Sequence, residues 1–544
     1  MMLKSLVGAA LLALSLNAGA ATTPKLPVFE GNTDGIPSAT DVPYSEGDFK
    51  KESAAAVGRA SRTVAQSANF ENMMSPQMKQ LRADILSIRS SDELDAKLKT
   101  LAAAMDAVDA SDIKAGITKK NPYKGDDRDF RYYAAQIIPL QCLKGSVWRF
   151  TPLAQKSGVV ESKLVTTVYR LSQDMQIMTP QVSDMPSAEA REKAEKNNEQ
   201  NISVSVFDYM TKPYEGAVLF AEGFDLQEAL MNSCYTALRK SAGRLERLDL
   251  TNPIVFDNKI YFGVGTFPDD LDRYKQLGEA ERHLSLAMKH TGMHFISFFR
   301  AYSIKDYFKL QTELGKLYFK DAFPNLFTGN QEIDGVSLQK RANLIRTYHQ
   351  TFILYQDGPK YLKDYAWPHF VRAVQELNLV WSEVKDRPDN KRMVINPSFL
   401  NAVSRSTDEN LKAWNRIIEG PAPLHSRLTD NIVTVDLKNF YNSKTPVQDL
   451  KTFLPTAFDN QSSKMLDNKF TTMMPGPDRR PMDVTSKYSQ YHNWYYGAPK
   501  SWNMSAWQMI FPDLKAGDVP ETLRTVNEAW GGAILALPLM QFTR

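Results

Sequence analysis

The central part of the chain, residues 268–390, repeats apolar residues at the spacing of an α-helix. After Ser303, the residues that follow this spacing are Ile304, Phe308, Leu310, Leu314 and Leu317. The segments RANLIRTYHQTFILY and FVRAVQELNLVWSEV continue with the same period, and Pro368 precedes the second one, where proline suits the first helical turn. The pattern predicts a mainly α-helical fold with a multi-helix body, arranged as a helical-hairpin array or an α/α-type packing.

Shorter patterns on either side of this region predict a small mixed α/β portion. The segment FRYYAAQIIPLQCL is helical in pattern up to Pro139, whereas KLVTTVYRL is rich in the β-branched residues typical of strands. A short hairpin is predicted for PIVFDNKIYFGVG, with its turn at Asp257 and Asn258. Beyond residue 390 the helical segments shorten, which predicts long C-terminal loops.

These patterns predict four parts. Residues 1–20 read as a signal peptide, and residues 21–70, rich in Thr, Ser, Pro, Gly and Ala, predict an extended or disordered arm. We expect a helical and mixed domain over residues 71–250, with a polar insertion at 185–201. A helical domain with an aromatic-rich C-terminal loop region is expected over residues 251–544, because a chain of this length usually holds more than one core.

The first twenty residues have the layout of a secretory signal peptide. A positive charge at Lys4 precedes an apolar run over residues 6–16, and the small residues Ala18, Gly19 and Ala20 follow it. Cleavage after Ala20 is predicted. Because no later stretch reaches the roughly 20 apolar residues of a transmembrane helix, we expect a soluble protein without a transmembrane segment, either periplasmic or secreted.

Composition narrows the function classes further. The 66 basic and 62 acidic residues give a net charge of +4 with no long basic run, so we expect no nucleic-acid partner. The sequence contains no G-x-S-x-G, H-E-x-x-H or P-loop motif. We therefore expect no cofactor and favour a non-catalytic role.

The chain has two cysteines, Cys142 and Cys234, and both follow the predicted signal peptide. In an oxidising compartment such a pair can form a disulfide. However, Cys234 lies on the apolar face of a helix predicted from Asp225 to about Leu248, where a buried free thiol is equally expected. Both alternatives remain open at this point.

Three of the seven histidines, His283, His290 and His294, are spaced at i, i+7 and i+11. On an unbroken helix this spacing places the three imidazoles on one face, within about 40°. With neighbouring methionines they could bind a transition metal such as copper. We expect the pair Thr291-Gly292 to end the helix, which would separate the rings and favour capping and packing roles.

The segment YHNWYYGAPKSW, residues 491–502, concentrates aromatic side chains near the C-terminus. Tyrosine and tryptophan combine a large contact area with a polar group, so they suit a surface that binds glycan or another protein. The candidate ligand-binding residues are Tyr491, His492, Asn493, Trp494, Tyr495 and Trp502. The alternative, which we favour locally, is that these rings fill gaps between helices.

Part of this segment, NWYYGAP, resembles an Asn-Trp-aromatic stretch followed by Gly-x-Pro in helical polysaccharide lyases. The resemblance covers seven residues. It implies proton transfer by Tyr491 or His492 and neutralisation of a uronate carboxylate by Asn493.

Together these observations predict an exported, soluble, non-catalytic binding or scaffolding protein of the cell envelope. Its expected partner is glycan or another envelope protein, contacted through the aromatic C-terminal region. A glycan-active enzyme of the polysaccharide-lyase type is the first alternative, and a periplasmic metal-binding protein that uses His283, His290 and His294 is the second.

Overall fold

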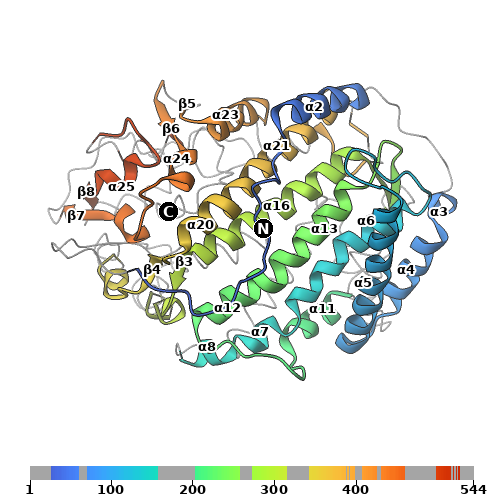
Figure 1. The fold of residues 1–544 in the computed structure, drawn as a ribbon, viewed down its shortest axis with the longest axis horizontal. Helices are drawn as coiled ribbons and strands as arrows, with labels where there is room; N and C mark the ends of the chain where they lie inside the picture. The colour runs from blue at the N-terminus through green and yellow to red at the C-terminus, as the bar shows by residue number, and fades with distance from the viewer. Residues whose placement is uncertain are drawn as a thin grey trace, which may run out of the picture.

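The computed structural model describes residues 26–60, 70–156, 202–257, 273–314, 342–397, 407–459 and 498–515, apart from residues 311, 388, 391–392 and 426–429, together with isolated positions between 519 and 526. Within these ranges the protein is mainly α-helical, as the sequence predicts, and the β structure is limited to small two-stranded sheets (Figure 1). The predicted polar insertion at 185–201 lies outside the described residues.

The helices vary from single turns to more than six turns. The α-helices are α2 (Glu46–Ala60), α3 (Phe70–Met73), α4 (Pro76–Ser87), α5 (Ser91–Lys114), α6 (Arg128–Ile137), α7 (Ser146–Arg149), α8 (Thr151–Lys156), α11 (Ile202–Thr211), α12 (Gly223–Ala229), α13 (Thr236–Glu246), α16 (Glu279–Ala301), α20 (Gly358–Tyr361), α21 (Trp367–Val384), α23 (Thr407–Glu419), α24 (Leu437–Asn442) and α25 (Met504–Gln508). Two 3₁₀ helices, η1 (Ile138–Leu143) and η5 (Leu450–Phe453), and two π-helical segments, η3 (Leu230–Tyr235) and η4 (Leu362–Ala366), accompany them.

Four antiparallel strand pairs lie between and beside the helices. They are β1 (Ile254–Asp257) with β2 (Tyr274–Leu277), β3 (Tyr302–Ile304) with β4 (Thr351–Leu354), β5 (Ala422–His425) with β6 (Ile432–Val435), and β7 (Pro455–Asp459) with β8 (Ala498–Trp502). Asp257, predicted to lie in a hairpin turn, is instead the last residue of β1 and is paired with Tyr274. The residues directly after it lie outside the described residues, so the rest of the predicted hairpin stays a prediction.

Helices α16 and α21 form the centre of the molecule and pack along each other (Figure 1). Most of their side chains are buried, including Leu286 and Met293 on α16 and Leu379 on α21. The predicted helix end at Thr291-Gly292 is wrong, because α16 continues without a break to Ala301. Glycine inside a helix costs about 1 kcal/mol relative to alanine. Burial of Met293 and Phe298 beyond the glycine outweighs this cost.

The N-terminal segment also differs from the prediction. Residues 26–45, here called the strap, contain no helix or strand, have turns at residues 34–35 and 40–41, and lie across the helical body, but residues 46–60 form helix α2. Helix α2 packs on α21, where Ala56 is fully buried beside Leu379, and Nε of Arg59 lies 2.6 Å from Oε1 of Glu383. The sequence of α2 has too few apolar residues to show a helical period, so these contacts with α21 decide its structure.

One large apolar cluster extends from Phe70 to Val526 and crosses the predicted domain boundary at residue 250. Helix α13, before this boundary, packs on α16, after it. The two-domain division therefore stays a prediction. None of the described helices is both long enough and apolar enough to cross a membrane.

Candidate binding groove under the N-terminal strap

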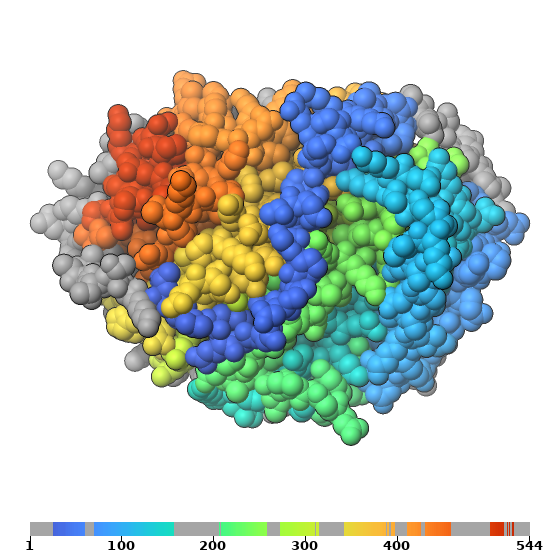
Figure 2. Space-filling model, viewed as in Figure 1, coloured from blue at the N-terminus to red at the C-terminus, as the bar shows by residue number. Residues whose placement is uncertain are grey.

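The strap lies against α13, α16, α20, η4 and α21, and the surface under it is here called the groove. Figure 2 shows the strap as a dark blue band over the green and yellow parts of the body. In its central part, side chains of the body bind strap carbonyl oxygens. Arg239 Nη1 donates to the carbonyl oxygens of Pro37 and Ser38 at 2.6 and 2.8 Å, and the Tyr365 hydroxyl donates to that of Ile36 at 2.7 Å. These contacts hold the main chain and do not depend on the strap side chains.

The same kind of contact occurs at both ends of the strap. The Asn232 amide donates to the Asn32 carbonyl at 2.9 Å, and the Gln356 amide group donates to the Leu26 carbonyl at 3.1 Å. Arg372 Nη1 donates to the Val42 carbonyl at 3.0 Å. Main-chain groups are therefore bound by side chains along the whole length of the strap.

The C-terminal end of the strap is fixed by Tyr44. Its main-chain N–H donates to Gln375 Oε1 at 2.9 Å, and its carbonyl accepts from Gln375 Nε2 at 3.2 Å. Lys119 Nζ and Arg372 Cζ each lie 3.5 Å from the centre of the Tyr44 ring. Two cations this close to one ring centre must cover opposite faces, so Tyr44 occupies a slot between two positive charges.

The N-terminal end of the strap contacts Arg300, which is 1% exposed. The Phe29 ring centre lies 3.3 Å from the Arg300 guanidinium carbon, and the Tyr361 ring centre lies 4.1 Å from it. Arg300 also forms a 2.6 Å ion pair with Asp357, and its Nη2 is 3.5 Å from the hydroxyl oxygen of Thr33. The buried charge is thus neutralised by Asp357 and covered by aromatic rings.

A polar cavity of about 360 Å³ lies beside this contact, between the strap and α16, α20 and η4. Besides Arg300 and Asp357, its charged lining residues are Glu30, Asp34 and Lys360. A cavity of this size and polarity holds water. The N-terminal half of the strap is therefore less tightly packed against the body than Tyr44 at the other end.

Two π-helical segments border the groove. Asn232 belongs to η3, and both Tyr365 and the Asp364 carbonyl, which accepts from the Ala39 N–H at 2.9 Å, belong to η4. π-helical segments are rare in proteins, and those that occur are frequently found at functional sites. Here both segments supply groups that bind the strap.

Behind the groove lies a buried network of charges. Glu376 is fully buried and accepts from Nδ1 of His283 at 2.5 Å and from Nε of Arg372 at 2.7 Å. Burial alone would raise the pKa of Glu376, but the charges of Arg372 and His283 hold this pKa well below its usual range. Arg372 also pairs with Glu246 at 2.6 Å, so the network connects α13, α16 and α21 with the strap.

His290 lies on the same face of α16 and meets a histidine from α21. Its Nδ1 is 2.9 Å from Nδ1 of His369, whose Nε2 is 2.9 Å from the Tyr235 hydroxyl. Burial lowers the pKa of His290 to about 3 and holds that of His369 well below its ordinary value. Both rings are therefore neutral, and one Nδ1 donates to the other.

His294, the third histidine of the series, has separate partners. Burial lowers its pKa to about 4, so the neutral ring donates from Nδ1 to the Ala366 carbonyl at 2.9 Å. The Tyr441 hydroxyl then donates to Nε2 at 3.3 Å. Each of His283, His290 and His294 is thus engaged by different groups, and the described residues include no cluster of three or more metal-ligating side chains.

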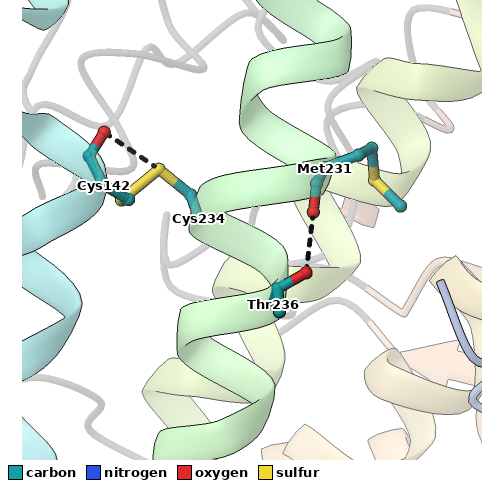
Figure 3. The surroundings of a disulfide bond; sticks show 4 residues. All are labelled: Cys142, Met231, Cys234 and Thr236. Atoms are coloured by element: carbon teal, nitrogen blue, oxygen red, sulfur yellow. Dashed lines mark hydrogen bonds between the residues drawn. A yellow bond between two sulfur atoms is a disulfide. The ribbon is translucent and has the colours of Figure 1, made fainter. Parts of the chain in front are cut away.

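Cys142 and Cys234 form a disulfide with a Cα–Cα distance of 5.0 Å, which joins η1 to η3 (Figure 3). In the same region the Thr236 hydroxyl donates to the Met231 carbonyl at 3.3 Å (Figure 3). The disulfide therefore anchors the segment that provides Asn232 to the strap.

Most of the predicted aromatic site lies outside the described residues, namely Tyr491, His492, Asn493, Trp494 and Tyr495. Trp502 is described. It ends strand β8, is partly buried, and packs against the main apolar cluster. At this position the packing interpretation agrees with the structure.

The comparisons with known proteins give no family for this chain. The sequence matches no protein-family model, and the searches of curated proteins and of solved structures found no match.

The groove was not predicted from the sequence. The strap carries Pro27, Pro37 and Pro43, which favour an extended chain and lower the entropy lost on docking. The residues that bind it, such as Arg239 and Gln375, come from helices far away in the sequence and follow no motif. The three prolines were thus the one feature of the sequence that indicated an extended, docked segment.

Proposed function

We propose that this chain is an exported, non-catalytic binding or scaffolding protein of the cell envelope, and that the strap groove is its site for an extended polypeptide segment. The observation that carries the proposal is the binding of strap main-chain groups by body side chains from Leu26 to Tyr44. Proteins that bind extended peptides obtain affinity from main-chain contacts and specificity from side-chain pockets. The strap would then be a built-in occupant of the site.

Two features support export. The first twenty residues have the charge and apolar pattern of a signal peptide. The two cysteines are paired, and stable disulfides are typical of oxidising compartments outside the cytoplasm. Contact with glycan through residues 491–502 stays a prediction.

The test uses a fluorescent peptide of residues 26–45 and the full mature protein carrying Tyr44→Ala. The substitution weakens the protein's own strap, whereas the added peptide retains the tyrosine that fills the slot between Lys119 and Arg372. We expect a saturable rise in fluorescence anisotropy. Unsubstituted protein should bind the peptide at least tenfold more weakly, because its own strap competes at a high effective concentration.

Matched variants on α13 show whether the peptide enters the groove. Arg239→Ala, made in the Tyr44→Ala protein, removes the donor to two strap carbonyls and should weaken peptide binding about fivefold or more. Lys240→Ala on the next residue removes a partly exposed contact with Asp106 outside the groove and should leave binding unchanged. Absence of binding, or equal binding by both variants, would contradict the proposal.

A further inference from the structure

Three side chains of the strap occupy sites on the body that restrict which residues can bind there. Phe29 is held by Arg300 and lies edge-on to the Tyr355 ring at a centroid distance of 5.2 Å. Ala39 is fully buried, which leaves no space for a larger side chain. Tyr44 fills the slot between two cations. A partner segment must therefore provide aromatic, small and aromatic residues at the positions of Phe29, Ala39 and Tyr44.

A second copy of the chain meets all these requirements. We propose that the extended segment bound in the groove is the strap of another molecule of the same protein, exchanged together with α2 between two copies. The proposal rests on the proposed function of the groove. Every contact of the strap would form identically between two chains, as in other domain-swapped dimers.

Helix α2 moves with the strap because both dock on the same face of α21. Ala56 packs on Leu379, close to where Tyr44 enters its slot, and Arg59 pairs with Glu383. Residues 61–69 connect α2 to α3, and nine residues can span about 30 Å when fully extended. Residues 26–60 are therefore followed by a single connection to the rest of the protein and can be exchanged as one unit.

The same contacts stabilise the monomer and the exchanged dimer. The equilibrium between monomer and dimer is therefore set mainly by protein concentration. In the monomer the strap is tethered beside its groove at an effective concentration in the millimolar range. The monomer should thus dominate at micromolar concentration, and exchange should occur at high concentration. Undocking is expected to start at the polar cavity beside Arg300, where the strap is packed least tightly.

The experiment detects exchange directly. Full-length mature protein carrying Arg59→Lys keeps a cation opposite Glu383, at the position where the native pair is 2.6 Å long. Isotopically heavy and light batches are mixed at about 1 mM, incubated, and treated with a zero-length carbodiimide that couples this amine to Glu383. We expect dimers by light scattering and, by mass spectrometry, cross-linked peptides that join a heavy α2 to a light α21.

Rate measurements separate exchange from ordinary association. Tyr44→Ala weakens docking equally in monomer and exchanged dimer, so it should speed the appearance of mixed cross-links about tenfold or more without raising the final dimer fraction. Tyr44→Phe retains the ring and should keep the original rate. Cross-links only within heavy or within light chains would overturn the exchange. If the peptide of residues 26–45 still bound, the proposed function would stand; if it did not, both proposals would fail.

Discussion

Glu376 is the residue where the buried charges behind the groove meet. It accepts hydrogen bonds from His283 and Arg372, and all three side chains are inaccessible to solvent. The carboxylate neutralises Arg372, which in turn holds the Val42 carbonyl of the strap. Loss of this one negative charge would leave a buried guanidinium paired with Glu246 alone.

We expect Glu376→Leu to lower the free energy of unfolding by about 3–5 kcal/mol, the usual cost of breaking a buried ion pair from one side. Urea denaturation followed by circular dichroism measures this change. Glu419→Leu, at an exposed position at the end of α23, is the matched control and should change stability by less than about 0.5 kcal/mol. A similar small effect of both substitutions would mean that the network contributes little to stability.

The roles of single residues were the least predictable part of this protein. The spacing of His283, His290 and His294 predicted one shared helix face if the helix continued past Gly292. Helix α16 does continue, so the three histidines share a face. The sequence could not show that Glu376, His369 and Ala366 would be their partners, because these belong to other parts of the chain. A shared helix face does not determine which helix packs on it.

At the scale of elements, the apolar period predicted α21 well but failed for RANLIRTYHQTFILY, which is helical only at residues 342–347. Its residues Thr351–Leu354 form strand β4, which pairs with β3, because local spacing does not show a partner strand that lies far away in the sequence. α21 begins at Trp367 with proline in its first turn, as expected from Pro368. α2 was missed because its sequence, EGDFKKESAAAVGRA, is mostly polar and gains its stability from α21. The end predicted at Gly292 was wrong for the same reason, since tertiary burial outweighs local propensity.

The burial of histidines on α16 predicts a dependence of stability on pH. In the folded state the pKa of His290 is about 3 and that of His294 about 4, both below the ordinary value of 6.5. As the pH falls below 6.5 the unfolded chain takes up protons first, so stability is present above pH 6.5 and is lost towards pH 3–4. We expect each histidine to contribute a loss on the order of 3–5 kcal/mol over this window.

The measurement is a series of urea titrations between pH 7 and pH 4. His294→Gln retains a donor for the Ala366 carbonyl and an acceptor for the Tyr441 hydroxyl but does not titrate. Its stability should therefore fall less steeply with decreasing pH, whatever its stability at pH 7. Parallel curves for the unsubstituted protein and the His294→Gln variant would contradict the prediction.

At the scale of the whole molecule, the disulfide lies within the part of the protein that the large apolar cluster holds together. The cluster includes Tyr235, beside Cys234, and reaches across residue 250 to α16, α21 and the C-terminal helices. Mainly helical content could be predicted because it sums many local signals. The arrangement of the helices could not, since it depends on contacts such as those of α13 with α16 that join distant parts of the chain.

The disulfide gives the last prediction, because it closes a loop of 92 residues within this part of the protein. In the chain-entropy model such a loop stabilises the folded state by about 4–5 kcal/mol. We expect Cys142→Ala with Cys234→Ala, or reduction of the native protein, to lower the melting temperature in one cooperative transition, since the shared cluster couples both halves of the chain. Calorimetry with and without reductant measures this change. The double variant is the control, because reductant should not affect it. Two separated transitions, with only the first sensitive to reductant, would instead support independent domains divided near residue 250.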